Sequence, residues 1–72
     1  MRSNRDPIGR LFARLAVELE DACELAVEGQ NPRLSLPRRS NLGDKLRGRL
    51  AVAATVLDRI GVEIVRHRRA LR

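Results

Sequence analysis

The chain has 72 residues, a mass of 8.1 kDa and a formal net charge of +6 at pH 7. A chain of this size forms one small domain, whose hydrophobic core leaves only a small net free energy of unfolding. One cysteine excludes an intramolecular disulfide, and one histidine excludes a zinc site of four Cys and His ligands within one chain. Self-association is therefore the expected source of additional stability.

Composition also narrows the classes of binding partner. Phe12 is the one aromatic residue, so the stacking platforms of single-strand nucleic-acid binders have almost no material here. The most apolar stretch, residues 50–65, is interrupted by charged side chains and is too short to cross a bilayer. The N-terminal residues lack the apolar segment of a signal peptide, so we expect a cytoplasmic protein without a transmembrane segment.

Helix one is predicted over about residues 7–28. Asp6 and Pro7 are a helix-start signal, because the Asp side chain accepts hydrogen bonds from free N–H groups and Pro lacks a donor that would be unpaired there. Gly29 is expected to end the helix in a left-handed conformation. Apolar residues recur at spacings of three and four, and we expect this stripe to be the core face: Ile8, Phe12, Leu15, Leu19, Ala22 and Ala26.

Helix two is predicted over about residues 41–71, after a loop of residues 29–40. Ser40 or Asn41 can cap its start. Its apolar residues cover about half of the helix circumference, which is more than one neighbouring helix buries. We expect several of them to form the core of a dimer: Leu46, Leu50, Leu57, Ile60, Gly61 and Ile64. Gly61 is the expected point of close helix contact.

Together these patterns predict an all-α fold, a two-helix antiparallel hairpin whose apolar faces are too broad for each other. Dimerisation into a four-helix bundle buries the excess apolar surface, so a homodimer is expected. The sequence leaves the relative orientation of the two hairpins open.

The loop contains Leu34 and Leu36 beside the basic pair Arg38 and Arg39. In one interpretation, which we favour, the two leucines close the end of the core. In the other, these four residues form a recognition segment that binds a partner protein. The sequence alone does not separate the two.

Charge is distributed unevenly along the chain. Residues 18–28 carry five acids and no base, and an antiparallel hairpin places them beside Lys45, Arg47 and Arg49 as intramolecular ion pairs. The opposite end combines the start of helix one with the end of helix two, without comparable acids. A solvated basic helix end is one interpretation of it. Phosphate binding is the other, because guanidinium groups grip phosphate in a bidentate manner; the candidate ligands are Arg10, Arg14, Arg66, Arg68, Arg69 and Arg72.

The sequence does not predict a catalytic or metal site. His67 lies among arginines, outside any Ser–His–acid or Cys–His pattern. Cys23 is predicted to be a buried, inert thiol on the core face of helix one. Carboxylates at positions 20, 24 and 28 repeat on one helix face, but they lack the Glu-x-x-His partner of di-metal bundles, so neither a metal nor another cofactor is expected.

Two function classes remain. The first is a small, non-enzymatic regulatory protein that binds RNA or DNA electrostatically through the Arg-rich end of a dimeric bundle. The alternative is a protein–protein adaptor or inhibitor of plasmid or phage type, which binds a partner protein through apolar helix and loop residues. The two differ in salt dependence, because only binding to phosphates weakens steeply as salt is added.

Overall fold

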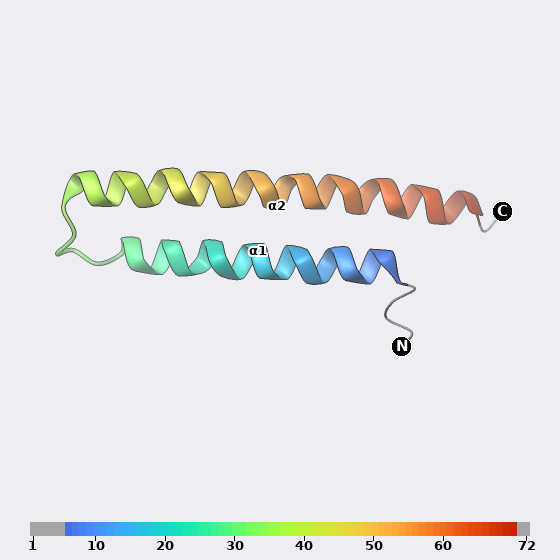
Figure 1. Ribbon diagram of the computed structural model, residues 1–72, viewed down its shortest axis with the longest axis horizontal. Coiled ribbons are helices and arrows are strands. Elements are labelled where there is room, and N and C mark those ends of the chain that lie inside the picture. The colour runs from blue at the N-terminus through green and yellow to red at the C-terminus, as the bar shows by residue number, and fades with distance from the viewer. Residues whose placement is uncertain (1–5, 71–72) are drawn as a thin grey trace.

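The computed structural model describes residues 6–70 and contains two helices, α1 (Pro7–Gly29) and α2 (Leu36–Ala70). They lie antiparallel and side by side, joined at one end by a short connection, and α2 continues beyond the start of α1 at the other end (Figure 1). This confirms the predicted all-α hairpin. The chain measures 56 × 23 × 12 Å, so the two helices form a single elongated layer.

The first turn of α1 is held by its capping residue. Asp6 accepts a hydrogen bond at Oδ1 from the backbone N–H of Gly9 at 2.8 Å, and its carbonyl accepts one from Arg10 N at 3.1 Å. Pro7 follows as the first helical residue, where its missing N–H leaves no bond unmade. The cap and the proline therefore set the start of the helix together.

The end of α1 differs from its predicted form. Gly29 is the last helical residue, Gln30 follows in a right-handed conformation with φ −75° and ψ −13°, and no glycine among the described residues has a positive φ. The predicted left-handed stop at Gly29 is therefore wrong. The chain leaves the helix through a side-chain turn instead, in which Asn31 Oδ1 accepts a hydrogen bond from Arg33 N at 2.9 Å.

α2 begins at Leu36, five residues before the predicted start at residue 41. Ser35 caps this end: its Oγ accepts a hydrogen bond from Arg38 N at 3.3 Å, and its carbonyl accepts one from Arg39 N at 3.0 Å. Pro37 lies in the first turn, where the helix tolerates it. The connection is therefore residues 30–35 rather than 29–40, because a cap followed by a first-turn proline starts this helix as it starts α1.

One narrow face of each helix forms the contact between them. The apolar residues buried or half-buried there recur at spacings of three, four or seven, as expected for helices packed at a shallow crossing angle: Ile8, Leu11, Leu15, Ala22 and Leu25 from α1, and Leu42, Leu46, Ala53, Val56, Ile60 and Ile64 from α2. We call this contact the seam. Ile60 is its most deeply buried residue, at 2% exposure.

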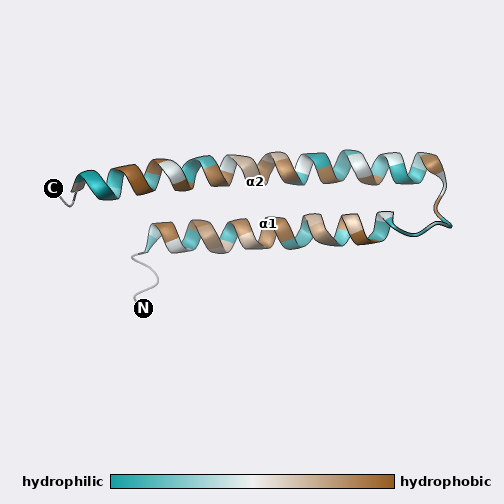
Figure 2. Ribbon diagram, turned by 180° about the vertical axis from the view of Figure 1, so that it is seen from behind, coloured by the Kyte–Doolittle hydropathy of each residue, from teal (hydrophilic) through white to brown (hydrophobic). Residues whose placement is uncertain are grey.

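The seam lies to one side of the predicted stripe on α1. Phe12 and Leu19 were expected in the core, but they are 50% and 47% exposed, and Leu11 and Leu25 take their place. Hydrophobic and hydrophilic segments alternate along both helices, and the end of α2 is mostly hydrophilic (Figure 2). The apolar arc of α1 is wider than the strip that α2 covers, so periodicity alone could not select the buried edge.

One further expectation fails for the same reason: Cys23 is exposed on the flank of α1 rather than buried. A Cβ added at Gly61 would meet nothing within 4 Å, so this glycine makes no close contact with α1, and its predicted contact in a dimer stays a prediction. The predicted dimer core also divides: Leu46, Ile60 and Ile64 belong to the seam, whereas the remaining three residues are exposed, namely Leu50, Leu57 and Gly61.

Replacement of Ser35 by Ala is expected to lower the free energy of unfolding by about 1 kcal/mol, because a first-turn N–H loses its acceptor. Ser40→Ala is the matched control; it lies inside the helix and is expected to be neutral or slightly stabilising. Urea denaturation followed by circular dichroism at one fixed protein concentration measures both. A larger loss for Ser40→Ala would move the start of α2 back to residue 41.

Truncation of Ile60 to Ala is expected to lower the free energy of unfolding by about 2–4 kcal/mol, because it opens a cavity at the most buried position of the seam. Val62→Ala, two residues along the same helix and exposed, should change it by less than about 0.5 kcal/mol. The same urea titration reports both values. Equal losses at the two positions would contradict the assignment of the seam.

Candidate nucleic-acid interface

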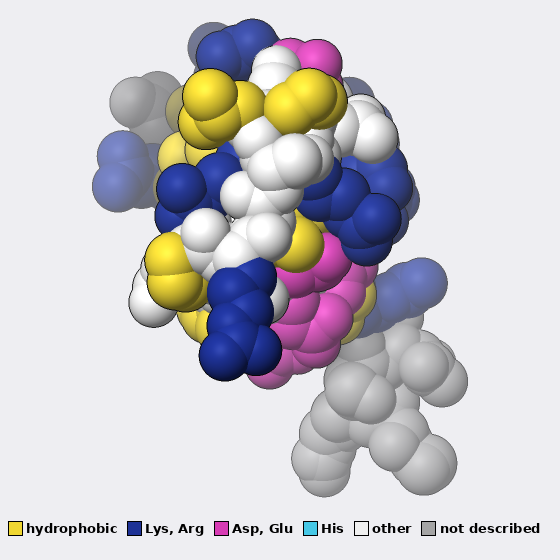
Figure 3. Space-filling model, turned by 90° about the vertical axis from the view of Figure 1, so that its left-hand side faces the viewer, with side chains coloured by type: hydrophobic (Ala, Val, Ile, Leu, Met, Phe, Trp, Pro, Cys, Tyr) yellow, Lys and Arg dark blue, Asp and Glu magenta, His cyan; other side chains and the backbone are white. Residues whose placement is uncertain are grey.

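The seam leaves each helix with two flanks, and because the helices are antiparallel the corresponding flanks share one side of the hairpin. Seen from the loop end, acidic side chains gather on one side and hydrophobic side chains are prominent on the other (Figure 3). The first side, the charged face, carries these residues: Arg10, Arg14, Glu18, Asp21, Glu28, Lys45, Arg49, Arg59, Glu63 and Arg66. The second, the apolar face, carries Phe12, Ala16, Leu19, Cys23, Leu50, Ala54, Leu57, Gly61 and Val65.

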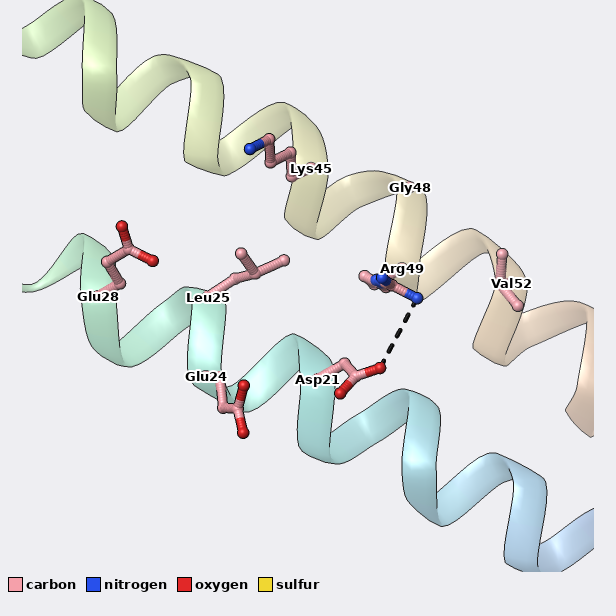
Figure 4. Close-up of a pocket in the computed structure, with 8 residues that line it drawn as sticks. All are labelled: Asp21, Glu24, Leu25, Glu28, Lys45, Gly48, Arg49 and Val52. Atoms are coloured by element: carbon pink, nitrogen blue, oxygen red, sulfur yellow. Dashed lines mark ion pairs between the residues drawn. The ribbon is translucent and has the colours of Figure 1, made fainter.

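Near the loop, the charged face contains a shallow pocket in which acids and bases are paired. Arg49 of α2 points toward Asp21 of α1 across this pocket (Figure 4). Its Nη1 lies 3.4 Å from Glu18 Oε1 and 3.7 Å from Asp21 Oδ2. One guanidinium thus joins two carboxylates of the acidic stretch, as the sequence predicts for this end. Such partly exposed pairs add little stability individually and mainly favour one register.

The other two predicted cations behave differently from Arg49. Arg47 pairs with Asp44 of its own helix, with Nη1 3.7 Å from Oδ1, and both side chains are well exposed. Lys45 lines the pocket without an ion pair to any residue of the described range 6–70. Only one of the three cations therefore bridges the helices.

The half of the charged face near the termini is predominantly basic. Arg10 and Arg14 of α1 line a pocket together with Arg59 and Glu63 of α2. Arg66 lines the adjoining pocket with the same glutamate. We call these four arginines the basic cluster: Arg10, Arg14, Arg59 and Arg66. Four arginines share these two pockets with one carboxylate, so this region keeps a net positive charge.

Glu63 organises the α2 side of the basic cluster. Its Oε2 lies 3.6 Å from Arg59 Nε and accepts a hydrogen bond from Arg66 Nη1 at 3.3 Å. The Glu63 side chain is only 15% exposed, whereas both arginines remain well exposed. A single carboxylate therefore holds two guanidinium groups in place while their other donors stay open to solvent. The expectation that this end lacks compensating acid has to be corrected accordingly.

The six predicted phosphate ligands do not all lie on one surface. Arg10, Arg14 and Arg66 belong to the basic cluster. Because successive residues turn by about 100° around a helix, Arg68 falls toward the apolar side and Arg69 toward the outer side of α2. Arg72 lies outside the described residues. The prediction grouped arginines that are close together in the sequence near the end of α2. On a helix, however, the residues that share one side are those one or two turns apart.

Arg59 is the cluster residue that sequence reasoning missed. A signal for it exists: Arg59, Glu63 and Arg66 follow an i, i+4, i+7 spacing, which places all three on one side of a helix. The hairpin then brings this side of α2 against the start of α1. The pairing of the two helices, rather than the α2 spacing, is what adds Arg10 and Arg14 to the site.

At the loop end, three of the four predicted partner-binding residues contact the hairpin itself. Leu34 is half-buried, Arg39 Nε donates a hydrogen bond to the Gly29 carbonyl at 3.1 Å, and Arg38 Nη2 lies 3.9 Å from Glu28 Oε2. Leu36, the first residue of α2, is exposed. These contacts close the end of the hairpin, in agreement with the interpretation favoured for Leu34 but not with that for Leu36.

Within residues 6–70, no group of three or more His, Cys, Asp or Glu side chains is placed to hold a metal ion, and neither helix has an apolar stretch long enough to cross a bilayer. No protein family, curated protein or solved structure matches the chain. Its function therefore has to follow from its own geometry. The basic cluster, with forked donors from two helices, is suited to binding an anion that spans several phosphates.

Replacement of Arg49 by Gln is expected to lower the free energy of unfolding by less than about 1 kcal/mol at low salt, because its two ion pairs are partly exposed. The loss should shrink at high salt, which screens the pairs. Arg47→Gln, which removes a pair within one helix, is the control and should have a smaller effect. Urea titrations at both salt concentrations test this; a larger loss for Arg47→Gln would contradict the bridging role of Arg49.

Proposed function

We propose that this chain is a small, non-enzymatic regulatory protein that acts as a dimer of hairpins and binds the phosphate backbone of RNA or DNA. The observation that carries the proposal is the basic cluster, which draws arginines from both helices onto one half of the charged face. The hairpin creates this cluster from residues far apart in the chain. The alternative, in which the basic residues of α2 only form a solvated helix end, gives no reason for arginines of α1 to lie beside them.

The charge arrangement of the basic cluster supports binding to a polyanion. Arg59 and Arg66 lie two turns apart, about 10 Å along α2. Duplex DNA carries one charge per about 1.7 Å of its axis, so a surface of this length faces several phosphates at once. Arg10 and Arg14 form no ion pair with residues 6–70, which leaves their donors for a ligand.

The same surface offers little means of reading bases. Phe12, the one aromatic residue, lies on the apolar face, away from the basic cluster. Contacts to phosphates fix the position of a nucleic acid but carry no direct sequence information. We therefore propose binding that depends on charge and on backbone geometry more than on base sequence.

A protein adaptor is the second candidate function. The observation in its favour is the exposure of large apolar side chains on the apolar face. A complex formed through that face would be largely insensitive to salt, because burial of apolar surface does not depend on ion screening. Salt dependence therefore separates the two candidates.

The triple variant Arg10→Gln, Arg14→Gln and Arg59→Gln is expected to bind nucleic acid more weakly than the wild type. The slope of log affinity against log salt should fall by roughly 0.7–0.9 for each phosphate contact that is lost. Fluorescence anisotropy with labelled duplex RNA, duplex DNA and single strands measures affinity over a series of salt concentrations. Circular dichroism checks that the variant remains helical.

The control removes the same number of positive charges near the loop, through Arg33→Gln, Arg38→Gln and Lys45→Gln. Its effect on affinity should be clearly smaller. Glu63→Gln should act in the opposite direction and strengthen binding, because the one carboxylate of the cluster region loses its charge. Equal weakening by both triple variants, or no binding by the wild type at low salt, would refute the proposed function.

A further inference from the structure

The hairpin exposes more surface than a compact protein of its mass. Its accessible surface is 6045 Å², whereas a compact monomer of this size exposes about 4500 Å². The excess of about 1500 Å² is larger than the ~800 Å² that each partner buries in an interface of standard size. A single layer of two helices covers neither of its broad faces, so the molecule has both the area and the need for a further layer.

Five exposed large apolar side chains lie on the apolar face, where they alternate with smaller residues at helical spacing. On α1 the spacing is four, three and four, through Phe12, Ala16, Leu19 and Cys23. On α2 it is four, three, four and four, through Leu50, Ala54, Leu57, Gly61 and Val65. Both rows run parallel to the seam and are offset from it in the same sense, so they form one continuous strip. The pockets lined by charged side chains of both helices lie on the opposite face.

The centre of the strip has a symmetric order of large and small residues. The seam register is fixed by the Arg39 hydrogen bond to Gly29 and the Arg49 ion pair with Glu18. In this register Ala16 and Ala54 lie nearly level at the centre of the strip. Large residues flank this centre on both sides: Phe12 and Leu57 toward the termini, Leu19 and Leu50 toward the loop. Because large residues lie at similar distances on both sides of the centre, this part of the strip can pack against the same part of a second copy that runs in the opposite direction.

The geometry points to a homodimer in which the two apolar faces pack together, with a two-fold axis near Ala16 and Ala54 and the loops at opposite ends. Phe12 and Leu57 then pack against the partner's Leu19 and the partner's Leu50. Each α1 lies beside the α1 of the other copy, and likewise each α2. This arrangement is a four-helix bundle. It gives a definite orientation to the dimer of the proposed function, and it rests on the proposed function for the existence of that dimer.

The length of α2 favours this orientation. α2 has 35 residues, Leu36–Ala70, so its midpoint falls beside Ala54. A two-fold axis at that point pairs α2 with its copy over the full length. The part of α2 that extends beyond the start of α1, including the exposed Val65, is then covered by the first turns of the partner's α2. With both loops at the same end, α2 would face the partner's α1, which begins at Pro7, and no helix of the described residues would cover this extension.

Charge favours the same orientation. Arg47 and Asp58 lie at the rim of the strip on opposite sides of its centre, seven and four residues from Ala54. In the dimer, Arg47 of one copy therefore lies about one helical turn from Asp58 of the partner subunit, twice over. Asp58 makes no ion pair within residues 6–70. The two basic clusters fall at opposite ends, where they do not repel each other. The charged faces remain on the outside, so association leaves the phosphate-binding surface open.

Engineered disulfides distinguish the orientations. In a Cys23→Ser background, Ala16→Cys and Ala54→Cys each place a thiol near the two-fold axis. Each single variant is expected to form a disulfide-linked dimer with its own copy on mild oxidation, because such a bond needs Cα atoms within about 7 Å. With loops at the same end, position 16 would lie against position 54 of the other copy, and only a mixture of the two variants would cross-link. That result would overturn the proposal.

Thr55→Cys in the same background is the control for random collision, since Thr55 lines a pocket on the charged face. It should not cross-link, and equal cross-linking at position 55 would refute the assigned face. None of these measurements involves nucleic acid. A failure of the dimer is therefore distinguishable from a failure of phosphate binding.

A second measurement addresses association without cysteines. Leu57→Asp should halve the mass found by sedimentation, because a charge would enter the interface. Val62→Asp is the control, because Val62 lies on another side of α2; this variant should remain a dimer. The two positions are matched in exposure, since Leu57 is 54% exposed and Val62 is 52% exposed. A dimer that survives Leu57→Asp, or a wild type that sediments as a monomer at every concentration, would overturn the proposal.

Discussion

The contact between α1 and α2 uses one narrow strip of each helix, and most features of the molecule depend on that narrowness. Two helices packed at a shallow angle cover about one residue in every three or four on each other. The side chains at the centre of the contact are buried, Ile60 most of all. Everything outside the strip stays in contact with solvent. A two-helix chain thus has two broad faces, and their chemistry is set by residues that take no part in the seam.

On the charged face, several acidic side chains form ion pairs near the loop, whereas Glu63 forms ion pairs with arginines of the basic cluster. Glu18 and Asp21 share Arg49, and Glu28 faces Arg38 near the loop. These pairs consume the positive charge at that end. Toward the termini the balance reverses, because Glu63 is the one acid placed among four arginines. The same face therefore has a neutralised half that favours the register and a positive half that is available to an anion.

Because the apolar face and the basic cluster lie on different sides of the hairpin, the proposed association and the proposed ligand binding would not compete. A partner on the apolar face would not cover the basic cluster, and a polyanion on the charged face would not cover Phe12 or Leu57. A partner copy would also stabilise the hairpin by mass action, so its measured stability would depend on protein concentration. For a domain with so small a core, this contribution compares with the whole free energy of unfolding.

The sequence by itself determined that the chain forms two helices in an antiparallel hairpin, because apolar residues recur with helical spacing on both sides of a proline-containing connection. It also determined the start of α1, since Asp6 and Pro7 act locally. The sequence also contains a signal of the same kind for the start of α2, a capping residue followed by a first-turn proline, although Ser35 and Pro37 were predicted to be loop residues. Such signals depend on a few neighbouring residues and need no knowledge of the rest of the fold.

The tertiary structure alone decided which edge of each apolar arc is buried. Leu11 and Phe12 are adjacent and both apolar, and a rotation of α1 about its axis by a fraction of a turn would exchange their roles. The position of α2 places Leu11 in the seam and Phe12 outside it, and it also leaves Leu19 and Cys23 exposed. It also decided that Arg59 joins Arg10 and Arg14. Those residues meet only through the register of the two helices, which is a property of the packed pair and not of either segment.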